Sequence, residues 1–337
     1  MSMRRFLQCG LVAALSVAAI LPMSSARVSA GAQDPPVPTG ERKCTLTRLA
    51  SLDMTQTPSG HLTVPVSVAG TTRNFVVGLQ GASAISVDLA SELRLHRKDL
   101  LYGHNMITQI GGLPAFEAAD VPDVQVGVVH SDSMEMYIIG DTIRGRPLPM
   151  PGGEGVSGVL GTSFLKNFDV EFDFKSNKLN LYAPTTCGGD IVFWARSYAE
   201  VPFQLNELDT VLFPMKLDGK DITGQPDLEA KPAVMGTAAV EQVFGIKKDT
   251  PGFERTPDGN YRHPFKALAV DGLAINNPVV EIHPDNPGEE CRGKRYGLRL
   301  CFGGSDMRIG LTELRALHLY FSFRDKQLYI TAADAHL

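Results

Sequence analysis

The chain carries one sequence pattern twice, with a constant offset of 149 residues. Residues 160–181 (LGTSFLKNFDVEFDFKSNKLNL) align without a gap on residues 309–330 (IGLTELRALHLYFSFRDKQLYI), so that Gly161 falls on Gly310. A shorter upstream match, VPVSVAG on FPMKLDG, has the same offset. A constant offset at both ends of a unit indicates two copies of one supersecondary assembly. The chain is therefore expected to fold as two similar halves.

Four segments of these two copies resemble the aspartic peptidases of the retropepsin and pepsin type. In that family each lobe runs from a strand into an Asp-Thr-Gly loop, then through a flap hairpin to a hydrophobic-hydrophobic-Gly turn. Residues 75–95 and 227–246 resemble the two loops, and residues 158–174 and 308–323 resemble the two closing turns. The match spans roughly residues 44–333. The resemblance implies a mainly β, bilobal fold of two related β-barrel-like lobes with short helices.

The peptidase motif is degenerate in both copies. The first loop has leucine and glutamine where the family has Asp and Thr, followed by a family-like Gly-Ala-Ser: Leu79, Gln80, Gly81, Ala82 and Ser83. The second loop keeps the aspartate but loses Thr and Gly: Asp227, Leu228, Glu229 and Ala230. In the family two carboxylates share one proton, so that one acts as base and the other as acid. Leucine can do neither, and Asp227 is the one vestigial catalytic candidate.

These loops leave three functions open. The favoured one is a catalytically impaired module that binds an extended peptide or protein segment between the lobes, since main-chain hydrogen bonds do not need the acids. The second is an active aspartic endopeptidase that uses Asp227 and a second, unidentified acid, for which Glu229 on the same loop is one candidate. The third is a structural or assembly role. No cofactor and no metal is expected in any of them, and the oligomeric state stays open.

Several smaller features are assigned to local structure. Gly111 and Gly112 are expected at the tip of a flap-like hairpin. Ser86 is placed to cap a short helix that follows it. Ser163 and Thr312, which are equivalent in the two copies, are expected to cap the helices after the Gly turns.

The repeated strands predict which side chains face solvent. Asp169 and Asp173 alternate with apolar residues in the strand 168–174, so both are expected on a solvated strand face. His318 aligns with Asp169 in the second copy and is expected to point outward too. Trp194, the single tryptophan, is expected in the core.

The N-terminus has the features of an export signal. Arg4 and Arg5 precede an apolar run over residues 6–23, and Val28-Ser29-Ala30 fits a cleavage site. Residues 1–30 are therefore predicted to be a signal peptide that directs the protein to the bacterial periplasm or out of the cell. An uncleaved inner-membrane anchor is the alternative, because the apolar run is near the lower length limit for a bilayer span. No later segment predicts a membrane span.

The rest of the chain is divided by composition and by the repeat. Residues 31–43 are predicted to be a flexible lead-in, residues 44–198 the N-terminal lobe and residues 199–337 the C-terminal lobe. The formal net charge of −5 becomes −8 when the three arginines of residues 1–30 are removed. An acidic chain without a basic stripe is a poor partner for nucleic acid.

Four cysteines follow the signal segment: Cys44, Cys187, Cys291 and Cys301. An even number in an exported chain indicates disulfides, and four cysteines allow three pairings. Cys44–Cys187, which would close the first lobe, and Cys291–Cys301 are the favoured pairs. Free thiols or a metal site are the alternatives, but neither a CxxC spacing nor a histidine cluster supports a metal.

Overall fold

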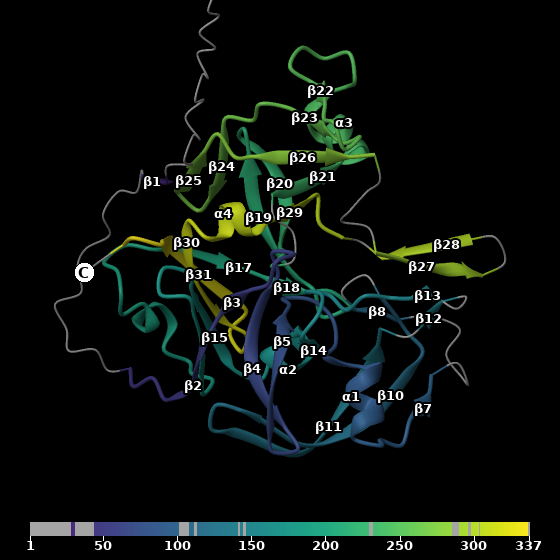
Figure 1. Ribbon diagram of the computed structural model, residues 1–337. Coiled ribbons are helices and arrows are strands. Elements are labelled where there is room, and N and C mark those ends of the chain that lie inside the picture. Colours follow the sequence, from purple (N-terminus) through teal and green to yellow (C-terminus); the bar gives the residue numbers. More distant parts are fainter. Residues whose placement is uncertain are drawn as a thin grey trace, which may run out of the picture.

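The computed structural model describes most of the chain after its N-terminal segment (Figure 1). The described residues are 28–30, 44–100, 108–110, 113–140, 142–143, 146–228, 232–284, 290–295, 298–302 and 304–335. The chain is mainly β, with three large sheets, three two-stranded ribbons and a few short helices. This agrees with the fold class expected from the sequence.

The first large sheet is built from the N-terminal half and curls into a barrel-like lobe. Its eight strands lie in the order β3-β4-β5-β14-β6-β11-β10-β7, and an additional pairing of β4 with β10 closes it. Their bounds are β3 Thr55–Gln56, β4 Leu62–Val68, β5 Thr71–Val77, β14 Val156–Leu160, β6 Ala84–Ser86, β11 Val129–Ile139, β10 Glu117–Val126 and β7 Lys98–Asp99. The long strands β10 and β11 pair with each other and lie at the lower end of this lobe (Figure 1).

The second large sheet repeats this plan in the C-terminal half. Its path is β1-β25-β24-β19-β20-β29-β21-β26-β23-β22, with β18 attached to β19. The bounds are β1 Val28–Ala30, β25 Leu273–Asn276, β24 Ala267–Val270, β18 Gln204–Leu205, β19 Val211–Leu217, β20 Lys220–Pro226, β29 Met307–Ile309, β21 Ala233–Gly236, β26 Val280–His283, β23 Tyr261–Arg262 and β22 Glu254–Arg255. Val28–Ala30, which the sequence predicts as the signal cleavage site, form the edge strand β1 and pair with β25.

The third sheet is shared by the two halves. Its order is β17-β31-β30-β15-β16-β2, so the central pair β15 and β30 joins one copy of the repeat to the other. The bounds are β17 Ala199–Pro202, β31 Gln327–Ala332, β30 Leu317–Ser322, β15 Asp169–Asp173, β16 Lys178–Tyr182 and β2 Arg48–Asp53. In Figure 1 this sheet lies to one side, between the lower and the upper lobe.

Helices are short and occupy matching places in the two halves. They are α1 Val87–Glu92, α2 Thr162–Leu165, the 3₁₀ helix η1 Gly188–Ile191, α3 Thr237–Phe244 and α4 Leu311–Leu314. Ser86 accepts a hydrogen bond from the N–H of Leu89 at 3.1 Å, which confirms the predicted cap of α1. The three ribbons are β8 Thr108–Ile110 with β9 Leu113–Ala115, β12 Thr142–Ile143 with β13 Arg146–Pro147, and β27 Glu290–Arg295 with β28 Leu298–Phe302.

The hairpin turn near the start of each half has the same backbone geometry. β4 and β19 start 149 residues apart, and so do β5 and β20. The turn between each pair has two residues at positive φ, Ala69-Gly70 in the first half and Asp218-Gly219 in the second. Two consecutive positive φ angles are the geometry of the tight turn that matches the twist of a hairpin, and Asp-Gly favours it.

The shared sheet is buried on both faces. Its inner face carries Val170, Phe172 and Phe321, which belong to the main hydrophobic core. Its outer face is covered by residues 187–195, which pack against tyrosines of the sheet in a separate cluster. The alternation in β15 therefore does not separate core from solvent, because both sides of the strand are covered.

Candidate functional site

The loop of the first lobe is fastened to the closing turn behind it. Ser83 donates its N–H to Ser163 Oγ at 2.9 Å, and the N–H of Gly161 donates to Ser83 Oγ at 3.1 Å. A Cβ on Gly161 would lie 2.6 Å from the carbonyl oxygen of Ala82, so this turn needs glycine. Ser163 thus holds the loop instead of capping α2, whose N-cap is Gly161 without a side-chain hydrogen bond.

Backbone hydrogen bonds define which loop residues correspond between the lobes. The N–H of Gly78 donates to the carbonyl of Leu160 at 3.1 Å, and the N–H of Asp227 donates to the carbonyl of Ile309 at 2.9 Å. The strands that precede them, β5 and β20, pair in parallel with β14 and β29 in the same register. Gly78 is therefore the counterpart of Asp227, and the alignment that put Leu79 there is one residue off.

Leu79 and Leu228 both belong to the core. Each is about 1% exposed. The first loop also bonds directly to the second lobe, because the carbonyl of Leu79 accepts from the N–H of Val211 at 3.3 Å and the N–H of Gly81 donates to Leu208 at 3.1 Å. The loop residues named from the sequence therefore do lie where the halves meet, but as packing and main-chain contacts.

A neutral hydrogen-bonded bridge links the two halves at this point. Gln225 donates its amide to Gln80 Oε1 at 2.8 Å, and Ser305 donates its hydroxyl to Gln225 Oε1 at 3.2 Å. Gln225 is buried at the end of β20, two residues before Asp227. Gln80 of the first loop thus contacts the opposite half.

The surviving aspartate is paired with an arginine. Asp227 is almost fully buried, and its Oδ2 lies 3.1 Å from Nη1 of Arg308 on β29. The Asp227 carboxylate is thus held by a guanidinium, and the corresponding residue of the other loop, Gly78, carries no acid. Sequence reasoning missed Arg308, although a charge in a strand aligned with the apolar Val159 was a signal.

Some predicted residues lie outside the described part of the chain. These are Glu229 and Ala230 of the second loop and Gly111 and Gly112 of the flap, although the strands β8 and β9 on both sides of the flap tip are present. Cys291 and Cys301 lie opposite each other in the backbone pairing of β27 with β28. Their side chains are outside the described part of the chain, so the predicted disulfide between them stays a prediction.

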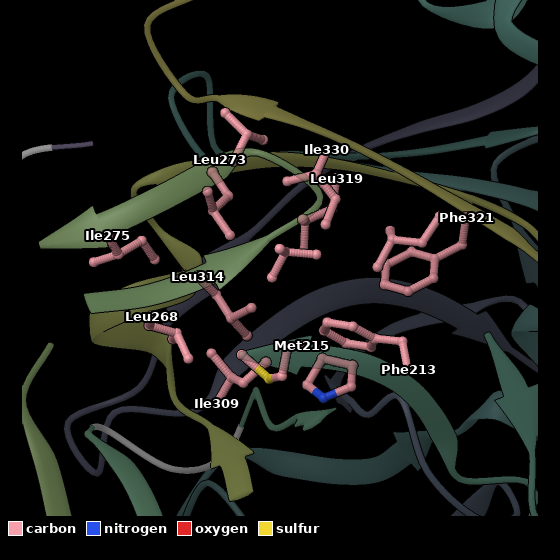
Figure 2. A pocket seen from close by; sticks show the side chains of 14 residues that line it. Phe213, Met215, Leu268, Leu273, Ile275, Ile309, Leu314, Leu319, Phe321 and Ile330 are labelled. Carbon is pink, nitrogen blue, oxygen red and sulfur yellow. The ribbon is translucent and has the colours of Figure 1, made fainter. Parts of the chain in front are cut away.

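An apolar cavity lies in the core of the second lobe, behind the aspartate loop (Figure 2). Figure 2 shows Phe213 and Met215 on one side and Phe321 of the shared sheet on the other. Pro226, which precedes Asp227, forms part of the wall, and the volume is about 20 Å³. Its lining is apolar, and apolar cavities without polar partners for a water stay dry. The cavity is a packing void of the core.

A polar cluster that the sequence did not predict lies on the outer face of the shared sheet. Glu171, which is 2% exposed, receives three partners: His318 Nε2 at 2.8 Å, Asn180 Nδ2 at 2.7 Å and the hydroxyl of Tyr182 at 2.8 Å. The expectation that His318 points into solvent is wrong, because residues 187–195 cover this face. We call these four residues the Glu171 cluster.

Asp169 lies beside the cluster and is fully buried, contrary to the sequence expectation. Its Oδ2 accepts from the N–H of Thr185 at 3.1 Å and from the hydroxyl of Tyr320 at 3.3 Å. Burial raises the pKa of the Asp169 carboxyl to about 6, because desolvation outweighs these hydrogen bonds. Asp173, at the end of the same strand, is half-buried.

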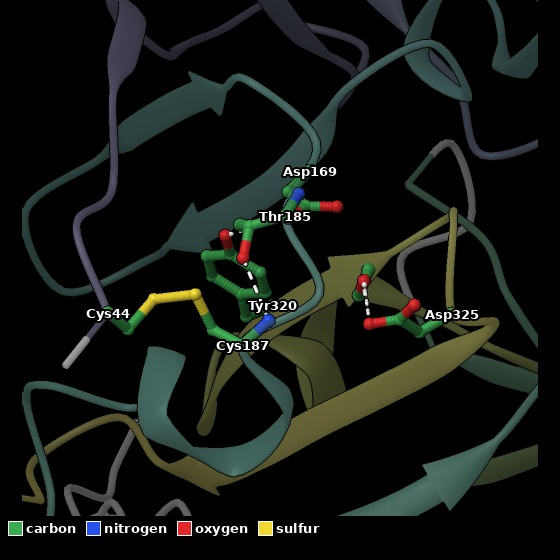
Figure 3. Close-up of a disulfide and its surroundings, with 7 residues drawn as sticks. Cys44, Asp169, Thr185, Cys187, Tyr320 and Asp325 are labelled. Atoms are coloured by element: carbon green, nitrogen blue, oxygen red, sulfur yellow. Dashed lines mark hydrogen bonds between the residues drawn. A yellow bond between two sulfur atoms is a disulfide. The ribbon is translucent and has the colours of Figure 1, made fainter.

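The predicted disulfide between Cys44 and Cys187 is confirmed, with the two Cα atoms 5.7 Å apart (Figure 3). It lies next to Thr185 and Tyr320 at the edge of the buried polar groups. Trp194, which is partly buried, stacks on His318 with ring centroids 4.2 Å apart and donates its indole N–H to Thr331 at 2.9 Å.

Within the described residues no group of three or more His, Cys, Asp or Glu side chains is arranged to hold a metal ion. No helix in the described part of the chain is long and apolar enough to cross a membrane.

Comparisons with known proteins give a likeness in structure only. No protein-family model matches the chain, and no curated protein matches it. Among solved structures, the chain is similar to the crystal structure of an aspartic proteinase from Irpex lacteus, at 13% sequence identity and a TM-score of 0.49. The match covers 85% of this chain and 97% of the other.

Proposed function

We propose that this chain is an exported, two-lobed protein of the aspartic-peptidase type whose peptidase centre no longer catalyses hydrolysis. The observation that carries the proposal is the ion pair between Asp227 and Arg308, together with Gly78 at the position that corresponds to Asp227. A working dyad needs two carboxylates that share a proton. Here the one carboxylate faces a permanent cation, since guanidinium does not lose its proton in proteins.

The remaining activity that fits this arrangement is binding of an extended peptide or protein segment between the lobes. Strand addition uses main-chain N–H and C=O groups and needs no acid. The described strands of the ribbon β8–β9, on either side of the predicted flap tip, supply such groups. We assign the lobes to residues 44–198 and 199–337, and removal of residues 1–30 as a signal peptide would place the protein in the periplasm or outside the cell, where disulfides persist.

Catalysis is tested by incubating the purified chain, from acidic to neutral pH, with a reduced and alkylated protein and detecting fragments by mass spectrometry. We expect no fragments beyond those formed with the Asp227→Asn variant. The matched control is Asp221→Asn, which removes an exposed acid from β20, the strand that leads into Asp227. Turnover that is lost in Asp227→Asn and kept in Asp221→Asn would overturn the proposal and establish an active endopeptidase with a second acid.

Binding is tested with a library of fluorescent ten-residue peptides, ten residues being on the order of the reach of one extended strand segment. Saturable binding that persists in Asp227→Asn is expected, because main-chain bonds do not use the carboxylate. If no peptide in the library binds, the peptide-binding role is rejected and a structural role of the lobes is left.

A further inference from the structure

A short segment of chain lies over the outer face of the shared sheet as a strap. The strap comprises residues 183–195, between β16 and β17, and includes the 3₁₀ helix η1. Its apolar side chains pack in a small cluster that is separate from the main core. The buried members of this cluster are Tyr182, Ile191, Val192, Ala195, Tyr320 and Tyr329. The strap can therefore lift away without opening the core of either lobe, as local unfolding units do.

Few noncovalent bonds fasten the strap to the polar groups beneath it. The N–H of Thr185 donates to Asp169 at 3.1 Å, and Trp194 donates to Thr331 at 2.9 Å and stacks on His318. Each such bond contributes little net stability, because water replaces it when it breaks. Beneath the strap lies a carboxylate, Asp169, whose burial is itself unfavourable when it is charged.

The covalent attachment of the strap is the disulfide from Cys187 to Cys44, just ahead of β2 (Figure 3). Both cysteines are half-buried, and Cys44 forms part of the wall of an open groove with Arg48, Asp190 and Phe193. A thiolate in solution can therefore approach this bond, whereas a disulfide inside the core could not be attacked. Access is one of the conditions for thiol–disulfide exchange.

We propose that Cys44–Cys187 is a thiol–disulfide exchange site whose reduction releases the strap and uncovers the Glu171 cluster. The reductant is a dithiol. One of its thiolates attacks a sulfur of the bond to form a mixed disulfide, and its second thiol resolves that intermediate. The dithiol is oxidised to a disulfide, and Cys44 and Cys187 each gain one electron and one proton to become thiols. The lobes stay folded, and the outer face of the shared sheet becomes accessible.

The single tryptophan provides the measurement, since Trp194 lies in the strap and stacks on the sheet. The purified chain is compared before and after treatment with dithiothreitol, by Trp194 emission and by hydrogen–deuterium exchange. We expect a red shift of the emission and a loss of amide protection in the strap of at least about tenfold, while β4, β5, β19 and β20 stay protected. The Cys44→Ser, Cys187→Ser double variant should show the released state without reductant.

A matched control separates this site from the other two cysteines. The Cys291→Ser, Cys301→Ser double variant removes any response of that pair and should leave the effect of dithiothreitol on Trp194 unchanged. Emission and exchange that do not change on reduction would overturn the proposal, because the strap would then be held by its noncovalent contacts. Loss of amide protection throughout both lobes would also overturn the proposal, because the disulfide would then stabilise the whole fold and not the strap alone.

Discussion

Two buried carboxylates of this protein each contact a basic side chain, and the kind of base differs. At the meeting point of the lobes Asp227 lies 3.1 Å from a guanidinium, and on the shared sheet Glu171 lies 2.8 Å from the imidazole of His318. A guanidinium is a fixed cation in a protein, whereas an imidazole presents single ring nitrogens to its partners. Glu171 also accepts from the amide of Asn180 and the hydroxyl of Tyr182, so its removal would leave several buried groups without their acceptor.

The largest effect on stability is expected from a substitution of Glu171. Glu171→Leu should lower the free energy of unfolding by about 3–5 kcal/mol, because a buried pair is broken and the amide of Asn180 and the hydroxyl of Tyr182 also lose their acceptor. Urea denaturation at neutral pH measures it. Glu171→Gln keeps an acceptor oxygen and should cost less. A Glu171→Leu variant as stable as the unmodified chain would show that the cluster adds no stability.

A second effect is a pH dependence that originates beside this cluster. The pKa of Asp169 is raised from its ordinary value of 3.8 to about 6 by burial, so the folded state favours the protonated carboxyl. The protonated Asp169 carboxyl stabilises the folded state fully below about pH 4, and this stabilisation is lost as the pH rises through about 6. A shift of two pKa units corresponds to about 3 kcal/mol of unfolding free energy. Unfolding free energies measured between these pH values test this. Asp169→Asn should remove that part of the slope, and an unchanged slope would contradict the assignment.

Glu313 is expected to act in the same direction at slightly higher pH. Burial in α4 raises its pKa to about 7, against the opposing effect of hydrogen bonds from the backbone of Val279 and Ala233. Stability should therefore also fall as the pH rises through about 7. Glu313→Gln separates this contribution from that of Asp169, because the two variants should flatten different parts of the curve.

The Asp227 pair should respond less strongly than the Glu171 pair. Arg308→Met leaves a buried carboxylate without its cation, but Arg308 is 28% exposed, so water can partly replace it. We expect a loss of about 2 kcal/mol, below the range for fully buried pairs. A double-mutant cycle with Asp227→Asn measures the coupling. Strictly additive effects of the two changes would show that the pair makes no net contribution.

The smallest expected effect belongs to the neutral bridge between the halves. Gln80→Ala removes the acceptor for the amide of Gln225 and should cost about 1 kcal/mol, the usual net value of one hydrogen bond. Denaturant unfolding with the exposed Gln125→Ala as a surface control measures it. A loss as large as that of Arg308→Met would show that the bridge contributes more than one ordinary hydrogen bond.

Much of the architecture was predictable from the sequence because it depends on local pattern. The cap at Ser86, the repeated strands β15 and β30 and the Cys44–Cys187 bond were all predicted and are present. Leu79 was aligned with Asp227, whereas backbone pairing makes Gly78 its counterpart. The second loop is one residue longer than the first between strands that otherwise correspond, so no single offset aligns both ends of the two loops.

The sequence by itself determined the division into two similar halves and the pairing of Cys44 with Cys187. Only the tertiary structure decided which polar side chains are buried and what they meet. Asp169, Glu171 and His318 occur in strands whose alternation predicts a solvated face. The strap that follows β16 covers that face, for His318 from the other half of the chain. Alternation reports that a strand has two faces, whereas burial depends on whatever packs on each of them.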